Sequence, residues 1–155
     1  MSDATLASSV FVDANDAITF ASSLLNGQGV SAEVSAAIAT CLVQADLRGV
    51  QTHGMSRLPI YVKRVERGLV NALPNMRLHK SMAACASLDG DNGFGFLVGI
   101  RAMREAIGMA ETCGVGVVSA YNSNHFGMAA SYLLQAVTAG YFAFVFTNAA
   151  KSMPP

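Results

Sequence analysis

The sequence predicts an α/β fold in which a helical N-terminal segment precedes a mixed unit of helices and strands. Apolar residues recur at helical spacing up to about residue 67, and two short strand-like runs follow. Helical patterns then alternate with apolar runs of strand length, which is typical of a sheet covered by helices. We therefore expect a helical domain at residues 1–74 and the first part of an α/β domain at residues 75–155.

Three helices are expected in the N-terminal segment. Residues 13–26 and 31–48 each carry one apolar face, and polar residues able to cap a helix stand at both starts. These two helices are expected to form a hairpin. A third pattern covers residues 56–67, where Pro59 falls in the first turn and Gly68 ends the helix.

The second half of the chain alternates between the two kinds of element. The expected elements, in order, are strands at 76–80 and 85–88, a turn at 89–93, a helix at 94–112, a buried strand at 115–121, a helix at 128–139 and a buried strand at 141–148. The sequence stops directly after an apolar strand that nothing covers, which favours a fragment of a longer protein.

Charge and composition limit the classes of partner. Lys and Arg together number 10, as do Asp and Glu, so no overall field attracts nucleic acid or an anionic membrane. Only 13% of the residues are charged, which is unusual for a free-standing monomer. Apolar surface is therefore expected to meet a second subunit or a missing part of the same chain.

Cysteine and histidine spacing speaks against disulfides and metals. Cys41, Cys85 and Cys113 form neither a CxxC pair nor a disulfide framework, and the three histidines stand far apart in the sequence. The N-terminus lacks the basic start and apolar run of a signal peptide, and no apolar stretch reaches the roughly 20 residues of a membrane span. We expect a cytoplasmic protein with reduced thiols and no metal site.

One candidate site lies at the start of the third helix. His53, Arg57 and Tyr61 are spaced four residues apart, so they share one face if that helix begins by His53. Arginine binds a carboxylate in a two-pronged manner, and histidine is suited to proton transfer near neutral pH. The alternative is that Arg57 is a surface ion-pair partner and His53 only starts the helix.

A second candidate site lies at the ends of the two predicted buried strands. The run NSNHFG, which contains His125 and Gly127, follows one strand and precedes a helix, and α/β proteins place ligands at this edge of a sheet. Its backbone amides can bind a phosphate or a carboxylate. The next strand ends in TNAAKSMPP, where Thr147, Asn148 and Lys151 supply donors and charge. An ordinary polar turn is the alternative in both places.

These segments together resemble the malate/L-lactate dehydrogenase-like family. The run ADLRGVQTHGMSRLPIYVKRVERG, 45–68, is similar to a family segment of an acidic or polar residue, Arg-Gly, Thr or Ser with His-Gly, Arg and Tyr. SNHFG with the downstream Tyr132 and Gly140, and TNAAKSMPP, resemble two further family segments in the same order. The resemblance covers essentially the whole chain.

The resemblance implies a fold that is not Rossmann, and the glycines of DGDNGFGF, 89–96, do not satisfy GxGxxG. Members look like homodimers with a helical domain built from both chain ends and an α/β NAD(P)-binding domain between them. Residues 75–155 then correspond to the first, truncated part of the cofactor domain. Members are longer, and most of their cofactor contacts follow the point where this sequence stops.

The activity implied is hydride transfer between NAD or NADP and a small 2-oxo or 2-hydroxy acid. A cyclic-imine carboxylate reductase, or a truncated non-catalytic remnant that only dimerises, remains as an alternative. By resemblance, His53 matches the proposed proton donor and Arg57 the carboxylate-binding arginine, and Tyr61 and Asn148 line the substrate pocket. His125 matches a second catalytic histidine. The residues expected near the cofactor are His125, Gly127 and Thr147.

Overall fold

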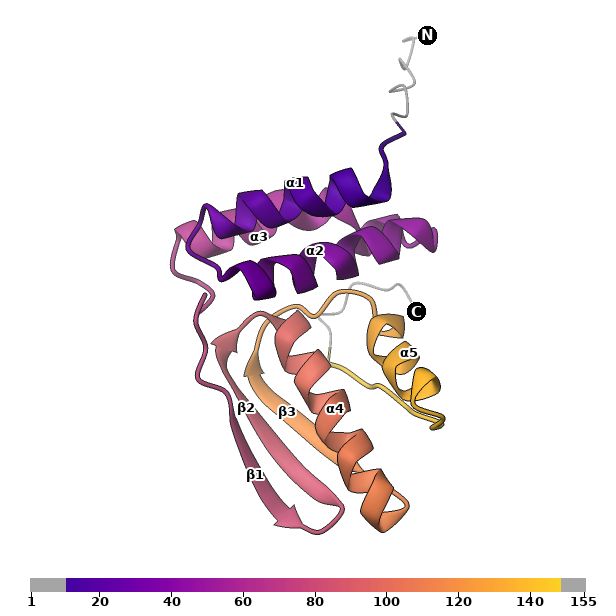
Figure 1. Cartoon of the computed structure of the whole chain (residues 1–155). Coiled ribbons are helices and arrows are strands. Elements are labelled where there is room, and N and C mark those ends of the chain that lie inside the picture. The colour runs from indigo at the N-terminus through magenta and orange to yellow at the C-terminus, as the bar shows by residue number, and fades with distance from the viewer. Residues whose placement is uncertain (1–10, 149–155) are drawn as a thin grey trace, which may run out of the picture.

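The computed structural model describes residues 11–148, so Lys151 lies outside the described residues. Helices α1 (Ala14–Asn26), α2 (Ala32–Leu47) and α3 (Leu58–Glu66) form one layer. Figure 1 shows this layer stacked on the end of a second unit that contains the sheet, α4 (Gly95–Cys113) and α5 (Ala130–Thr138). The α/β expectation is confirmed.

The hairpin of α1 and α2 forms as predicted because its signals are local. The Asp13 carboxylate caps α1 by accepting from the backbone N–H of Asn15 and Asp16, and the Ser31 hydroxyl caps α2. Leu25, Ile38 and Leu42 on the facing sides are fully buried. Burying each such side chain stabilises the fold by about 1.5–3 kcal/mol.

The third predicted helix begins later than expected. Two short 3₁₀ turns, Gln51–His53 and Met55–Arg57, precede α3 at Leu58. Gly54 separates the two turns with an extended backbone (φ −93°, ψ −154°), which interrupts any continuous helix. The condition that His53 lies on the same helix as Tyr61 is therefore wrong, and the two residues come together for another reason, described below.

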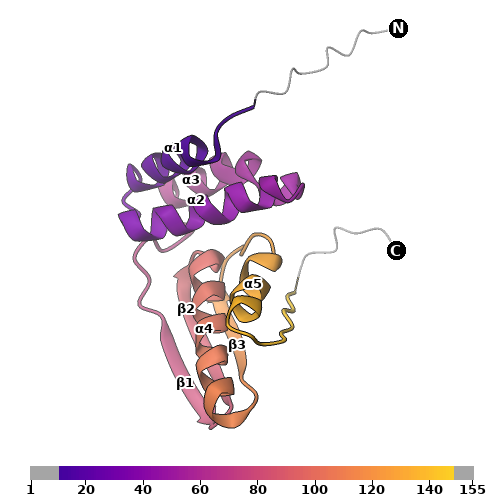
Figure 2. The same cartoon turned by 45° about the vertical axis from the view of Figure 1, so that its right-hand side comes forward.

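The sheet has three strands in the order β1-β2-β3. β1 (Arg77–Met82) pairs antiparallel with β2 (Cys85–Gly93), and β2 pairs parallel with β3 (Val117–Ser123). The parallel pair is connected through α4, which runs along the sheet in Figures 1 and 2. The starts of β1, β2, α4 and β3 thus lie within two residues of the prediction.

The turn predicted at residues 89–93 is instead the end of β2. Pairing with β3 continues to Gly93 opposite Ser123, with an irregular register after Asp89. Asp91 and Asn92 adopt the left-handed backbone conformation there, which turn-forming residues tolerate. The turn-forming residues therefore make a bulge in a strand rather than a chain reversal.

The expectation of two buried strands at the end of the chain is wrong. β3 forms, but Val117 and Tyr121 are about half exposed, and residues 141–148 make no strand ladder. The three phenylalanines of that segment are exposed. The residues that alternate with them pack against a small cluster that contains Met103 and Tyr132. The physical reason is that a strand is buried only where other elements lie on both of its faces. Within residues 11–148, α4 covers one face of β3.

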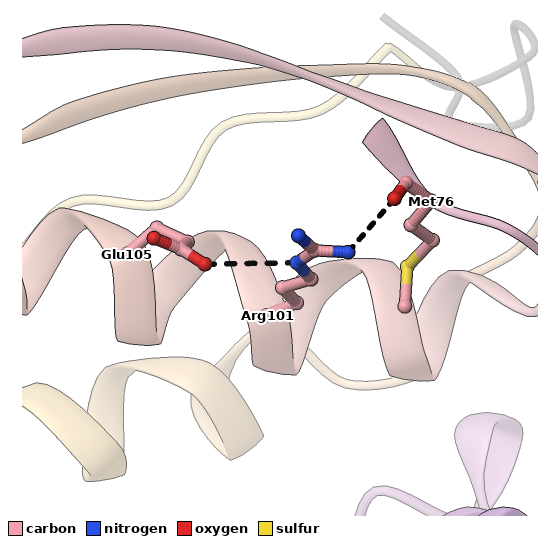
Figure 3. Close-up of polar contacts among 3 residues, drawn as sticks. All are labelled: Met76, Arg101 and Glu105. Atoms are coloured by element: carbon pink, nitrogen blue, oxygen red, sulfur yellow. Dashed lines mark hydrogen bonds and ion pairs between the residues drawn. The ribbon is translucent and has the colours of Figure 1, made fainter. Parts of the chain in front are cut away.

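A polar contact fastens α4 to the segment that enters β1 (Figure 3). The Arg101 guanidinium donates to the Met76 carbonyl at 3.0 Å and lies 3.6 Å from the Glu105 carboxylate, one turn along the helix. Such partly exposed helix pairs contribute about 0.3–0.5 kcal/mol. The bond to Met76 matters more for position, since it holds the outer strand against the helix.

No helix within residues 11–148 is long and apolar enough to cross a membrane. The same residues contain no group of three His, Cys, Asp or Glu side chains that could hold a metal ion. All three cysteines are free.

Candidate active site

Three residues of the predicted sites meet where the helical layer rests on the α/β unit. His53 comes from the first 3₁₀ turn, Tyr61 from α3 and His125 from the loop after β3. The rings of His53 and His125 stack with centroids 5.4 Å apart, and the Tyr61 hydroxyl lies 2.8 Å from Nδ1 of His125. The structure thus joins into one site the histidines that the sequence placed in two.

An aspartate on α2 fixes the turn that carries His53. The Asp46 carboxylate accepts from the backbone N–H of Met55 at 2.8 Å. A Cβ on Gly54 would overlap this carboxylate, so a larger residue there would force the Asp46 side chain away from the turn. Sequence reasoning treated Asp46 only as an acidic residue of the family segment and missed that it anchors the His53 turn.

Replacing Asp46 by alanine is expected to lower the free energy of unfolding by about 1.5–3 kcal/mol, since a hydrogen bond to a charged group is lost. Urea unfolding followed by circular dichroism measures this. Glu111→Ala, which removes an exposed carboxylate from α4, is the matched control and is expected to change little. Equal losses in the two variants would show that Asp46 does not anchor the turn.

Arg57 and His53 are held by the same short stretch of backbone. The Arg57 Nε donates to the Thr52 carbonyl at 2.7 Å, and the Thr52 hydroxyl lies 2.9 Å from Nδ1 of His53. The two terminal nitrogens of the Arg57 guanidinium make no hydrogen bond to residues 11–148. They can therefore bind an anion beside the two histidines.

The protonation state of His125 follows from its neighbours. Burial raises the pKa of Tyr61 to about 12, so the phenol keeps its proton and can donate a hydrogen bond to Nδ1 of His125. The Gly127 N–H also points at Nδ1, at 3.3 Å. A neutral imidazole that accepts at Nδ1 carries its proton on Nε2.

Electrostatics favour this neutral form. Partial burial lowers the pKa of His125 below its ordinary value, and the positive charges of His53, Arg57 and Arg64 lower it further. Burial and like charges both disfavour the imidazolium. The site therefore presents a neutral His125 with Nε2–H as a hydrogen-bond donor.

Two further residues of the site gave no signal at the sequence level. Arg64 on α3 donates to the side-chain oxygen of Asn124 at 2.7 Å, across 60 residues of sequence. Arg64 resembles any other charged residue of a helix, and Asn124 was noted only as part of NSNHFG. A contact between residues so far apart leaves no local pattern.

Within the described residues, no hydrogen bond joins the residues predicted near the end of the chain to the histidines. Thr147 and Asn148 are exposed, and the Thr147 hydroxyl donates to the Asn148 carbonyl at 3.3 Å. Within residues 11–148 neither side chain makes a hydrogen bond to His53 or His125. Their roles at the substrate and cofactor stay predictions.

Comparison with known proteins supplies the family. The chain is 41% identical over 132 residues to malate dehydrogenase of Pyrococcus horikoshii, a match that covers 85% of this chain and 37% of that protein. It is 39% identical over 127 residues to L-sulfolactate dehydrogenase of Methanocaldococcus jannaschii, covering 82% and 37%. The chain thus spans less than two fifths of the length of these relatives.

Structure comparison agrees with the sequence match. The structure of malate dehydrogenase from Pyrococcus horikoshii OT3 superposes with a TM-score of 0.82 at 40% identity, over 84% of this chain and 38% of that one. A family model described as malate/L-lactate dehydrogenase matches residues 12–155. The resemblance drawn from the three sequence segments is confirmed, and the chain belongs to the malate/L-lactate dehydrogenase family.

Proposed function

We propose that the protein containing these residues is an oxidoreductase that transfers hydride between NAD(P)H and C2 of a small 2-oxo or 2-hydroxy acid. The observation that carries the proposal is the stacked pair His53 and His125 beside the partly unpaired guanidinium of Arg57. An anion-binding fork next to a proton donor and a neutral hydrogen-bond donor suits a 2-oxo acid. The names of the relatives, malate and sulfolactate dehydrogenases, support the same class.

Each residue of the site has a separate role in this reaction. Arg57 binds the substrate carboxylate through its terminal nitrogens. His125 donates Nε2–H to the C2 oxygen and orients it, and Tyr61 keeps His125 in that tautomer. His53 gives the proton to the same oxygen as C2 gains a hydride, which yields the 2-hydroxy acid.

His53 is assigned the proton because the two stacked rings cannot easily both be charged. Their centroids are 5.4 Å apart, and Arg57 adds a further positive charge beside them. Like charges at this distance push one group to the neutral form. The backbone N–H of Gly127 points at Nδ1 of His125 and can only donate, so His125 is assigned as the neutral member of the pair.

The cofactor, NAD or NADP, supplies or accepts the hydride when bound. We infer that His125, Gly127 and Thr147 contribute to its site, and both His125 and Thr147 are exposed. An imidazole ring and a hydroxyl are both suited to contact the nicotinamide of the cofactor, which is a planar ring that carries an amide. The Gly127 N–H is turned to His125 instead, so this residue would act by shaping the loop. Tyr61 and Asn148 remain proposed lining residues of the substrate pocket.

We further infer the organisation of the whole protein from its relatives. Residues 1–74 would belong to a helical domain and residues 75–155 to the first part of an NAD(P)-binding domain. The exposed phenylalanines Phe142, Phe144 and Phe146 favour cover by more chain or by a second subunit of a homodimer. The proposed location is the cytoplasm, with a small-molecule substrate and without a nucleic-acid or membrane partner.

The test is an assay of NADH and NADPH oxidation by the product of the complete reading frame that contains these residues. Substrates would be a panel of 2-oxo acids and cyclic imine carboxylates. Turnover of a 2-oxo acid supports the proposal, and turnover of cyclic imines alone supports the carboxylate-reductase alternative. Absence of turnover with every substrate favours a non-catalytic protein that only dimerises.

Arg57→Lys is expected to raise KM and lower kcat together, with a loss of about 10–100-fold in kcat/KM. Lysine keeps the charge but loses the fork, and a hydrogen bond to a charged group contributes about 1.5–3 kcal/mol. Steady-state kinetics measure the loss. Arg67→Lys, at the exposed end of α3, is the matched control. Kinetic constants unchanged in Arg57→Lys would exclude it as the carboxylate ligand.

A further inference from the structure

The side chain of Asn124, the neighbour of His125, is fully engaged. Its Oδ1 accepts from Nη2 of Arg64 at 2.7 Å, and its Nδ2 lies 2.9–3.0 Å from the Asn92 carbonyl, the Asn92 Oδ1 and the Gly93 carbonyl. A guanidinium can only donate and a carbonyl can only accept, so the carboxamide fits in one orientation only. Asn124 thus connects α3 with the end of β2.

Further hydrogen bonds of Asn92 lead back to the chain just after α3. The Asn92 carbonyl also accepts from the backbone N–H of Asn71 at 2.9 Å, and the Asn92 side chain donates to the Leu69 carbonyl at 3.3 Å. Leu69 and Asn71 lie in the segment that leaves α3. The hydrogen bonds therefore form a ring from Arg64 through Asn124 and Asn92 back to the chain just after α3.

This ring stands next to the contact that sets the His125 tautomer. Tyr61 and Arg64 are one turn apart on the same face of α3. Tyr61 bonds the His125 ring and Arg64 bonds Asn124, and these two contacts join α3 to the loop by side chains. Because Asn124 and His125 are adjacent, fixing one side chain limits where the other can point.

We propose that Asn124 and Arg64 are positioning residues for His125, which lock its loop onto α3 so that Nδ1 meets Tyr61 and Nε2–H faces the open side of the site. What Nε2–H does there rests on the proposed function. The orientation itself does not, and it can be measured without any turnover.

The charged and titratable groups that face His125 come from two elements besides its own loop. The 3₁₀ turns contribute His53 and Arg57, and α3 contributes Tyr61 and Arg64. Removing the Arg64 charge takes away one of the influences that disfavour the imidazolium. The His125 pKa is then expected to rise, whereas a purely structural change elsewhere in α3 leaves it in place.

The experiment is a long-range ¹H–¹⁵N spectrum of the histidine side chains in the complete protein, which reports the tautomer and the pKa of each ring. The His125 ring of the unmodified chain is expected in the Nε2–H form. In Asn124→Ala the ratio of Nε2–H to Nδ1–H forms is expected to fall about fivefold, the effect of losing one net hydrogen bond. Arg64→Met is expected to do the same and to raise the His125 pKa.

Matched variants separate position from stability. Arg64→Lys keeps a donor and the charge and is expected to restore the His125 pKa, and Arg67→Met on the exposed end of α3 is expected to leave both readouts unchanged. Circular dichroism establishes which variants are folded. Should Asn124→Ala unfold, the comparison of Arg64→Met with Arg64→Lys carries the test. An unaltered tautomer ratio and pKa in the folded variants would overturn the proposal.

Kinetics of the complete protein separate this inference from the proposed function. A tautomer shift in Asn124→Ala with a matching fall in kcat supports both. A tautomer shift in a protein that never turns over a 2-oxo acid refutes the proposed function and supports the positioning role. Reduced turnover with the tautomer and pKa unchanged refutes the positioning role alone.

Discussion

Replacing His53 by glutamine is expected to lower kcat for reduction of a 2-oxo acid by about 10²–10⁴-fold, the usual cost of losing a positioned general acid. The glutamine amide fills similar space and can donate a hydrogen bond, but it cannot give up a proton at neutral pH. The fall in kcat of this variant therefore reports the loss of proton transfer and not the loss of a hydrogen bond. Single-turnover kinetics with saturating cofactor and substrate measure the chemical step directly.

The complementary substitutions at His125 give the contrasting pattern. His125→Ala is expected to cost about 10²–10³-fold in kcat, as removal of a donor to a developing oxyanion does in other enzymes. His125→Gln supplies another N–H and is expected to recover part of that loss. His79→Gln, on the exposed outer strand, is the control and should leave kcat unchanged. A nearly unchanged kcat in His53→Gln, together with no recovery in His125→Gln, would mean that the two histidines have the opposite roles.

The elements that could be predicted from the sequence are those with local signals. The hairpin of α1 and α2 follows from the caps Asp13 and Ser31 and from apolar residues at helical spacing. Helices α4 and α5 have no side-chain cap and follow from the apolar periodicity alone, and each begins within two residues of its predicted start. Caps and periodicity act over a few residues, so no knowledge of the rest of the fold is needed.

The candidate site was predicted in its residues but not in its geometry. The four-residue spacing of His53 and Arg57 suggested one helix face, yet Gly54 breaks that helix and Asp46 from α2 sets the turn. Their meeting with His125 depends on contacts that span 60 residues or more. The spacing of residues along one helix does not indicate which distant residues they will contact. Only the family resemblance linked the two histidines.

Burial at the end of the chain shows a different limit. Residues 115–121 and 141–148 are apolar enough for buried strands, and the first of these runs does become most of β3. Whether a strand is buried depends on what lies over it, which is a property of other elements. Phe142, Phe144 and Phe146 alternate outward while the residues between them pack inward, so the strand period is present without the cover.

The second large effect is expected from Gly95→Ala, which should lower the free energy of unfolding by about 1–3 kcal/mol. Gly95 is the first residue of α4, and the His125 loop crosses directly over it. An added Cβ would overlap the Asn124 carbonyl oxygen and lie 2.6 Å from the carbonyl oxygen of His125. Both neighbours are backbone atoms, so relief requires the loop to move rather than a side chain to turn.

Gly108→Ala is the matched control, because Gly108 lies in the same helix and a Cβ there meets nothing within 4 Å. Alanine in an open helix interior is expected to raise stability by about 0.5–1 kcal/mol. Urea unfolding of the two variants should therefore move in opposite directions. In Gly95→Ala the displaced loop should also weaken the contact between Tyr61 and His125, which the histidine tautomer reports. If Gly95→Ala proves as stable as Gly108→Ala, the loop is not seated on α4 as described, and the orientation of His125 must come from Tyr61 and Asn124 alone.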